Sequence, residues 1–152
     1  MTGLHSWLLF LHVAAAVVWL GGGTAMWMLG HRIRETQDPG ALGEFGKTLS
    51  FVGLRAFTPS VVVVLGTGIW MVVAGTGEFS QTWIVVAVVA FLIAFFIGAV
   101  YLSRQAILLD RLSNEGDLTG ARVALRRWLA GYGTVLAILV IALWDMVFKP
   151  GI

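Results

Sequence analysis

The sequence contains no cysteine, only three prolines among its 152 residues, and few charged side chains. The absence of cysteine excludes disulfides, thiolate catalysis, iron–sulfur clusters and cysteine-based zinc sites. A metal site would have to use His, Met, Asp or Glu side chains. The sequence also lacks HExxH, P-loop and GxGxxG motifs, so it gives no support to hydrolase, nucleotide-driven or dinucleotide-binding functions.

Apolar residues are abundant. Hydrophobic residues make up 59% of the chain and charged residues 12%, a balance that would leave large apolar patches exposed on a water-soluble domain. Four long apolar segments, at about residues 4–29, 57–74, 83–102 and 128–148, are each close to the ~20 residues that a helix needs to cross a bilayer. The sequence therefore predicts an all-α fold, in which residues 1–152 form a single bundle of four transmembrane helices in a lipid bilayer.

The basic residues lie on one side of this predicted bundle. Nine of the ten Lys and Arg residues fall in the segments 30–56 and 103–127, and only Lys149 falls on the other side. By the positive-inside rule, both basic loops are cytoplasmic and both termini are outside. The basic residues form no dedicated patch, so we expect no nucleic-acid partner.

Local signals predict where the helices begin. Thr58 and Pro59 suit an N-cap and the first position of a helix, so the second span is expected to start there. Residues 104–112 should continue the third helix, and residues 119–127 should form an amphipathic start to the fourth. The first span has no Lys or Arg before it and is longer than the apolar part of a signal peptide, so we expect it to remain in the mature protein.

Two histidines, His5 and His12, lie within the first span. At 100° per residue they share a stripe with Trp19 and Gly23, which we expect to face the bundle interior, where Gly22 also permits close packing. An imidazole in hydrocarbon is costly unless it is hydrogen-bonded or ligates something. His12 is therefore either a metal or cofactor ligand or an interior imidazole bonded to Ser, Thr or a carbonyl, whereas His5 is expected to be solvated at the interface.

Asp145 and Met71 are further candidates for chemistry within the spans. Asp145 is the only acid in a span, and we favour an i,i+4 ion pair with Lys149 at the membrane edge over a carboxylate that orients His5 or a substrate proton. Met71 is expected at a depth comparable with His12, where its sulfur could serve as a second ligand.

Several short motifs occur in order along the first, second and fourth spans. They are His12 with Trp19 and Gly21-Gly22, Arg55 with Pro59, Gly68-Ile69-Trp70, and Met146-Val147-Phe148-Lys149-Pro150. These motifs resemble the copper-resistance D-like membrane proteins and the four-helix bacterial protoporphyrinogen IX oxidases. The chain looks closest to a related, functionally uncharacterised integral-membrane family with the same Lys-Pro-Gly ending.

This resemblance implies a b-type heme with His12 as an axial ligand and with Trp19 and Gly22 beside the cofactor. The sixth position on the iron would be taken by Met71, by a group from another subunit, or by no protein group. It implies a redox protein of the bacterial inner (plasma) membrane that transfers electrons from a quinol or oxidises a small substrate. Partners would then be a quinone or porphyrin-like molecule and further copies of the chain. The third span lacks the oxidases' lysine and histidine, and Ala130-Gly131 replaces their Asn-Glu pair, so porphyrinogen oxidation is not implied.

Two alternatives remain open at this point. A copper-handling membrane protein could use His5, His12, Met71 and Met146 as ligands for Cu(I) along an outward-facing path. A non-catalytic membrane subunit would instead use the same polar stripe to pack against another protein.

Overall fold

The computed structural model of the chain describes residues 2–74 and 81–149, and every element in these ranges is a helix. The elements follow one another as α1 (Thr2–Ile33), α2 (Pro39–Val52), η1 (Gly53–Phe57), α3 (Thr58–Ala74), α4 (Thr82–Phe96), η2 (Ile97–Leu102), α5 (Ser103–Asn114) and α6 (Leu118–Phe148). The two η elements are π-helical turns that join α2 to α3 and α4 to α5 without a break.

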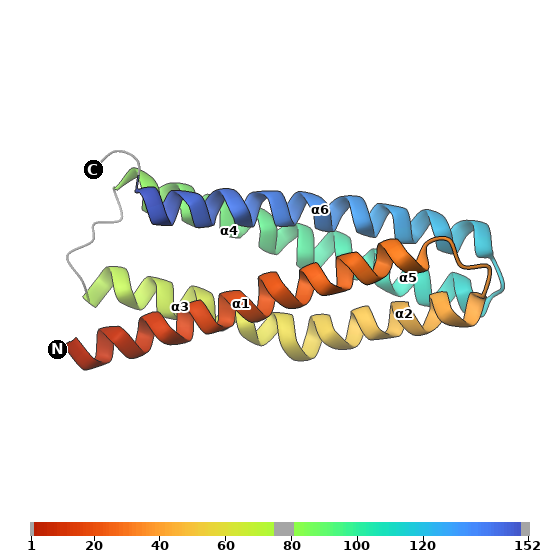
Figure 1. Cartoon of the computed structure of the whole chain (residues 1–152), viewed down its shortest axis with the longest axis horizontal. Helices are drawn as coiled ribbons and strands as arrows, with labels where there is room; N and C mark the ends of the chain where they lie inside the picture. The colour runs from red at the N-terminus through yellow and green to blue at the C-terminus, as the bar shows by residue number, and fades with distance from the viewer. Residues whose placement is uncertain (1, 75–80, 150–152) are drawn as a thin grey trace.

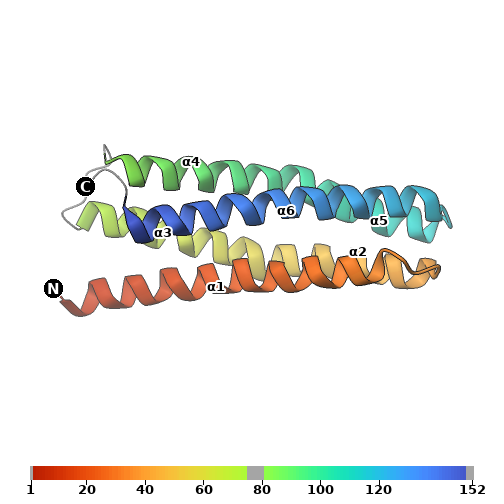
Figure 2. The ribbon, with the colours of Figure 1, turned by 45° about the horizontal axis from the view of Figure 1, so that its top comes forward.

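These elements form four antiparallel rods (Figures 1 and 2). The rods comprise 31, 36, 33 and 31 residues and are all long and apolar enough to span a membrane, which confirms the four-helix prediction. At 1.5 Å per residue each rod is about 45–55 Å long, against a hydrocarbon core of about 30 Å. More than a third of each rod therefore extends beyond the hydrocarbon, and the helices run well past the predicted span limits.

The start of α1 and the end of α6 lie at one end of the bundle, and the two basic connections lie at the other (Figure 1). At the basic end, Asp38 and Asp117 cap α2 and α6 by accepting from the backbone N–H of Gly40 and Gly120, each at 2.9 Å. Arg122 on α6 donates to the Thr36 carbonyl at 2.6 Å and so joins the two connections. Most of the connection between the second and third rods, predicted at residues 75–82, lies outside the described residues.

The best-packed core is at the basic end. There α2 and α5 pack closely on each other, α2 also contacts α1, and α5 contacts α6. Leu42, Leu109 and Leu125 are fully buried in this core, and Phe45 and Trp128 pack edge to face with 6.2 Å between ring centroids. Charged residues such as Glu44 and Lys47 cover the outer surface of the same helices.

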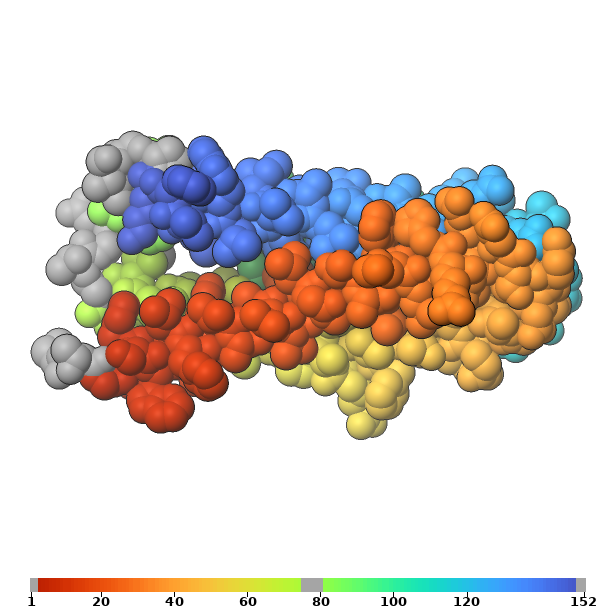
Figure 3. Space-filling model, in the orientation of Figure 1, coloured from red at the N-terminus to blue at the C-terminus, as the bar shows by residue number. Residues whose placement is uncertain are grey.

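The opposite half of the molecule exposes apolar side chains on its outside. Val17, Val62, Phe96 and Val147 are each at least 60% exposed, as expected of side chains that face lipid. In this half the rods pack in two pairs, α1 with α3 and α4 with α6. Figure 3 shows the surface hollowed between α1 and α6.

The prediction that the second span begins at Thr58-Pro59 is wrong. The helix runs through Pro59 because η1 widens the preceding turn, and the Thr58 hydroxyl and backbone N–H both donate to the Gly53 carbonyl. Proline removes one backbone donor and normally breaks a helix, whereas a π turn tolerates a lost bond. The predicted extension of the third helix through residues 104–112 and the amphipathic start of α6 are confirmed.

Gly46 makes the close approach of α2 to α5 testable. A Cβ atom at this position would lie 2.8 Å from the Asp110 backbone nitrogen and 3.1 Å from the Ala106 carbonyl oxygen, neither of which can move freely. We expect Gly46→Ala to destabilise the protein by about 1–3 kcal/mol through overpacking. Gly66→Ala is the control, since its Cβ meets no atom within 4 Å, and it should raise or preserve the melting temperature in detergent. Equal melting temperatures for both variants would contradict this packing.

The orientation predicted from loop charge can be tested because the chain has no native cysteine. Glu115, in the basic connection, and Thr82, at the opposite end, are both exposed. A membrane-impermeant maleimide applied to intact cells should label Thr82→Cys and not Glu115→Cys. Labelling of Glu115→Cys should require permeabilised cells, and the reverse pattern would invert the orientation.

Candidate functional site

His12 is hydrogen-bonded to Thr67, which lies on the neighbouring helix α3. The distance between His12 Nδ1 and Thr67 Oγ1 is 3.0 Å. The Thr67 hydroxyl oxygen also lies 2.6 Å from the Val63 carbonyl oxygen of its own helix. The one hydroxyl hydrogen can go to the Val63 carbonyl, in which case the His12 ring donates from Nδ1 to the threonine oxygen, or it can go to His12 Nδ1.

The two arrangements correspond to the two tautomers of the neutral imidazole. In the one with the proton on Nδ1, the lone pair of Nε2 is free to accept a hydrogen bond or to bind a metal. Gly68 lies directly beside the ring, since a Cβ there would come within 3.4 Å of His12 Cε1. The predicted interior hydrogen bond of His12 is thus confirmed. This hydrogen bond does not prevent His12 from also binding a metal or cofactor.

The stripe predicted on α1 faces the bundle at its inner positions. Trp19 is 7% exposed, and Gly23 is buried against the Tyr132 hydroxyl. His12 is half-buried at the outer end of this buried stripe, whereas His5 is exposed. The expected difference between the two histidines is confirmed.

The structure places Met71 on α3 beyond Thr67, and Gly22 on α1 against Phe57. Met71 is half-buried on α3 and lies four residues beyond Thr67, so its backbone is about 6 Å further outward than the partner of His12. Gly22 packs against Phe57, because a Cβ there would lie 3.2 Å from the Phe57 ring. Gly22 therefore serves the approach of α1 to η1.

The favoured ion pair between Asp145 and Lys149 does not form. Asp145 is 2% exposed, on the buried stripe of α6 that contains Val135 and Ala142. The Lys149 ammonium lies 5.1 Å from the centre of the Trp83 ring instead. The i,i+4 spacing suggested the pair, but Asp145 points into the bundle, where its Oδ2 atom has no hydrogen-bond partner among the described residues.

No group of three His, Asp or Glu side chains that could hold a metal ion occurs in the described part of the chain. His5, His12 and Asp145 therefore form no such group among the described residues.

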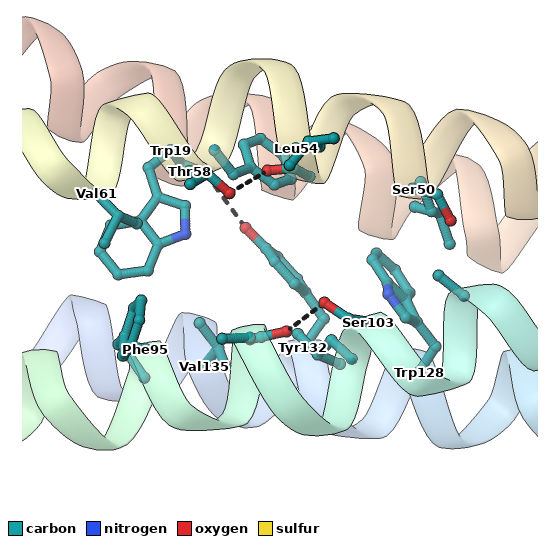
Figure 4. Close-up of a pocket in the computed structure, with 18 of the residues that line it drawn as sticks. Trp19, Ser50, Leu54, Thr58, Val61, Phe95, Ser103, Trp128, Tyr132 and Val135 are labelled. Atoms are coloured by element: carbon teal, nitrogen blue, oxygen red, sulfur yellow. Dashed lines mark hydrogen bonds between the residues drawn. The ribbon is translucent and has the colours of Figure 1, made fainter.

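A cavity of about 260 Å³ lies further toward the basic end, between the second and third rods (Figure 4). This cavity was not predicted from the sequence. Its floor includes Trp19, Trp128 and Tyr132, and its two walls contain the π turns η1 and η2. Tyr132 donates a hydrogen bond to the Trp19 carbonyl at 3.3 Å and stacks on Trp128 with 5.2 Å between ring centroids.

The two π turns carry the same sequence pattern. In η1 the Thr58 hydroxyl donates to the Gly53 carbonyl at 2.9 Å, and in η2 the Ser103 hydroxyl donates to the Gly98 carbonyl at 3.1 Å. Each hydroxyl thus satisfies a carbonyl five residues earlier, which a π turn displaces from the regular ladder. The pattern Gly-x₄-Ser/Thr at corresponding places in adjacent spans is the signal that could have located this cavity.

A four-rod helical bundle with apolar outer surfaces and two internal sites defines an integral membrane protein of the multi-pass class. A family model described as "Predicted integral membrane protein (DUF2269)" matches residues 6–150, and the chain belongs to this family. No curated protein and no solved structure matches the chain. Membership in an integral-membrane family is confirmed, and the resemblance to the copper-resistance D-like proteins and the oxidases stays a prediction.

The hydrogen bond between His12 and Thr67 can be tested by stability. Thr67→Val removes the hydroxyl that shares a hydrogen bond with His12 Nδ1, and interhelical hydrogen bonds in membrane bundles contribute roughly 0.6–2 kcal/mol. We expect a lower melting temperature in detergent. Ser60→Ala is the matched control, because the Ser60 hydroxyl bonds only to the Ala56 carbonyl of its own helix, and it should have little effect. A loss as large for Ser60→Ala would mean that the His12 bond adds nothing.

Proposed function

We propose that this protein is a redox protein of the bacterial plasma membrane that binds a b-type heme through His12. The observation that carries the proposal is the 3.0 Å hydrogen bond between His12 Nδ1 and Thr67 Oγ1. When the ring donates this bond, Nε2 has no proton and can bind iron. Axial histidines bind iron through such a neutral imidazole, held in place by a hydrogen bond from the other ring nitrogen.

The surroundings of His12 are compatible with a large flat cofactor. Gly68 and the buried Ala15 keep side-chain volume low near the ring. The space-filling view is hollowed between α1 and α6 in this half of the molecule (Figure 3). Apolar surroundings would also exclude water from the iron, which is one of the means by which a protein sets a heme potential.

A bound heme would supply one-electron transfer, and the chain's own residues would hold and insulate it. His12 would bind the iron, Thr67 would fix the orientation of the imidazole, and Met71, about one turn beyond Thr67 on α3, is the candidate for a second protein ligand. Asp145 has no described contact with His12. Its buried carboxylate is a candidate proton carrier near the outer surface.

Copper handling has less support than heme binding. Cu(I) prefers several sulfur and imidazole ligands in one place, and the half-buried Met71 lies about one turn away from the level of His12. His5 is exposed still further outward. These residues could form successive single contacts along a path, but none of the described contacts joins two of them.

An absorption spectrum of protein purified in mild detergent from heme-replete cells tests the proposal. We expect an intense Soret band that shifts on reduction, that His12→Ala abolishes, and that His5→Ala retains. Thr67→Val should weaken heme retention severalfold, because the imidazole loses the hydroxyl that orients it. Thr67→Ser keeps a hydroxyl at this position and should retain heme like wild type. Folding of each variant is checked by circular dichroism and gel filtration.

Met71→Leu is expected to shift the reduced spectrum without loss of heme if the sulfur is the sixth ligand. Colourless wild-type protein would overturn the proposal. Copper found by elemental analysis in such a sample, and lost with His12→Ala, would favour the copper alternative. Absence of both cofactors would favour the non-catalytic subunit.

A further inference from the structure

The cavity beside Tyr132 opens toward the bilayer. Leu54 on one edge and Phe95 on the other are 68% and 38% exposed, and both line the cavity. The exposed apolar side chains at the mouth of the cavity indicate that this side of the bundle faces acyl chains. A ligand would therefore enter laterally, between the second and third rods, and would have to be soluble in lipid.

The chemistry of the lining restricts the ligand to neutral molecules. None of the side chains that line the cavity is charged, so a buried carboxylate or phosphate would have no counter-ion there. The volume of about 260 Å³ is slightly below the ~300–1,000 Å³ of sites for drug-sized ligands. A flat head group of one or two rings fits this space, and a tetrapyrrole is too large.

Trp19 and Trp128 present two indole N–H donors to the cavity. Trp19 and Trp128 are 7% and 4% exposed, and Figure 4 shows their indole nitrogens on the sides that face the middle of the cavity. Neither indole N–H has a hydrogen-bond acceptor among the described residues. A ligand with an acceptor oxygen at each end of a flat ring would satisfy both donors.

Hydroxyl groups on the walls supply the complementary acceptors. The hydrogens of Thr58 and Ser103 are directed to carbonyls of their own helices, so each hydroxyl oxygen retains lone pairs. The cavity thus offers N–H donors to carbonyl oxygens and oxygen acceptors to phenolic O–H groups. A quinone needs the first kind of partner and a quinol needs the second.

We propose that this cavity binds the head group of an isoprenoid quinone, with its tail leaving between Leu54 and Phe95 into the bilayer. A phospholipid acyl chain matches the apolar lining but has no acceptor for the two indole N–H groups. The proposal does not depend on heme, because His12 lies seven residues, or about 10 Å, outward of Trp19 and does not line the cavity.

The proposal is tested by titrating detergent-purified, quinone-depleted protein with decylubiquinone and following tryptophan fluorescence. Trp19 and Trp128 would lie against the ring, so we expect saturable quenching at micromolar concentration. Decylbenzene, which has the same tail and no carbonyl groups, should give no saturable signal. The same titration of His12→Ala protein should be unchanged, which separates failure of this site from failure of the heme proposal.

Glycines provide matched cavity-filling variants. Gly98 and Gly53 line opposite walls, and a Cβ at either position meets no atom within 4 Å, so Gly98→Leu and Gly53→Leu should fill the cavity without a clash at Cβ. Each should weaken decylubiquinone binding at least tenfold. Gly66→Leu, which also meets open space but lies outside the cavity, should bind like wild type.

Loss of the donors should give a smaller effect. Trp19→Phe and Trp128→Phe are each expected to weaken binding severalfold, and Trp70→Phe, an exposed position outside the cavity, should not.

Equal quenching in wild type, Gly98→Leu and Gly53→Leu would overturn the proposal. Native mass spectrometry gives a second test. The proposal would also be overturned if phospholipid were found bound to wild type, if this phospholipid were absent from Gly98→Leu, and if decylubiquinone did not displace it.

Discussion

Close packing of α2 on α5 at the basic end is the constraint on which the rest of the structure depends. Gly46 brings the two helix backbones together, and the leucine-rich core around it fixes the second and third rods at that end only. Toward the other end the rods pair differently, α1 with α3 and α4 with α6. This change of packing partners explains the cavity and the hollow between α1 and α6. The four rods are held together at the basic end but form two separate pairs at the other end, which leaves space between the pairs.

The two π turns lie where this change of partners takes place. A bilayer supplies no water to satisfy displaced backbone carbonyls, so each wide turn needs an internal donor. Thr58 and Ser103 provide it from within their own helices, which also lets the second rod continue through Pro59. Their hydroxyl oxygens remain on the cavity walls, and the same residues that make the irregular backbone tolerable give an otherwise apolar space its acceptors.

The candidate site at His12 was found from sequence because a titratable side chain is rare in a hydrophobic run and therefore conspicuous. The partner of His12 could not be found from sequence. Thr67 is one of several hydroxyl residues, and only the packing of α1 against α3 brings it to His12. Asp145 was misjudged for a related reason. Spacing along one helix suggested Lys149, whereas the burial of Asp145 is decided by how α6 packs against its neighbours.

The sequence by itself determined the membrane environment, the number of helices and the common side of both basic loops. These features depend on hydrophobicity, segment length and loop charge, which are local properties of the chain that a bilayer constrains directly. Only the tertiary structure decided that Pro59 lies inside a continuous helix, that His12 pairs with Thr67, and that Trp19 and Trp128 face a common cavity. Those features depend on the register and crossing of distant helices, which small residues such as Gly23 and Gly46 set through side-chain contacts that no single span encodes.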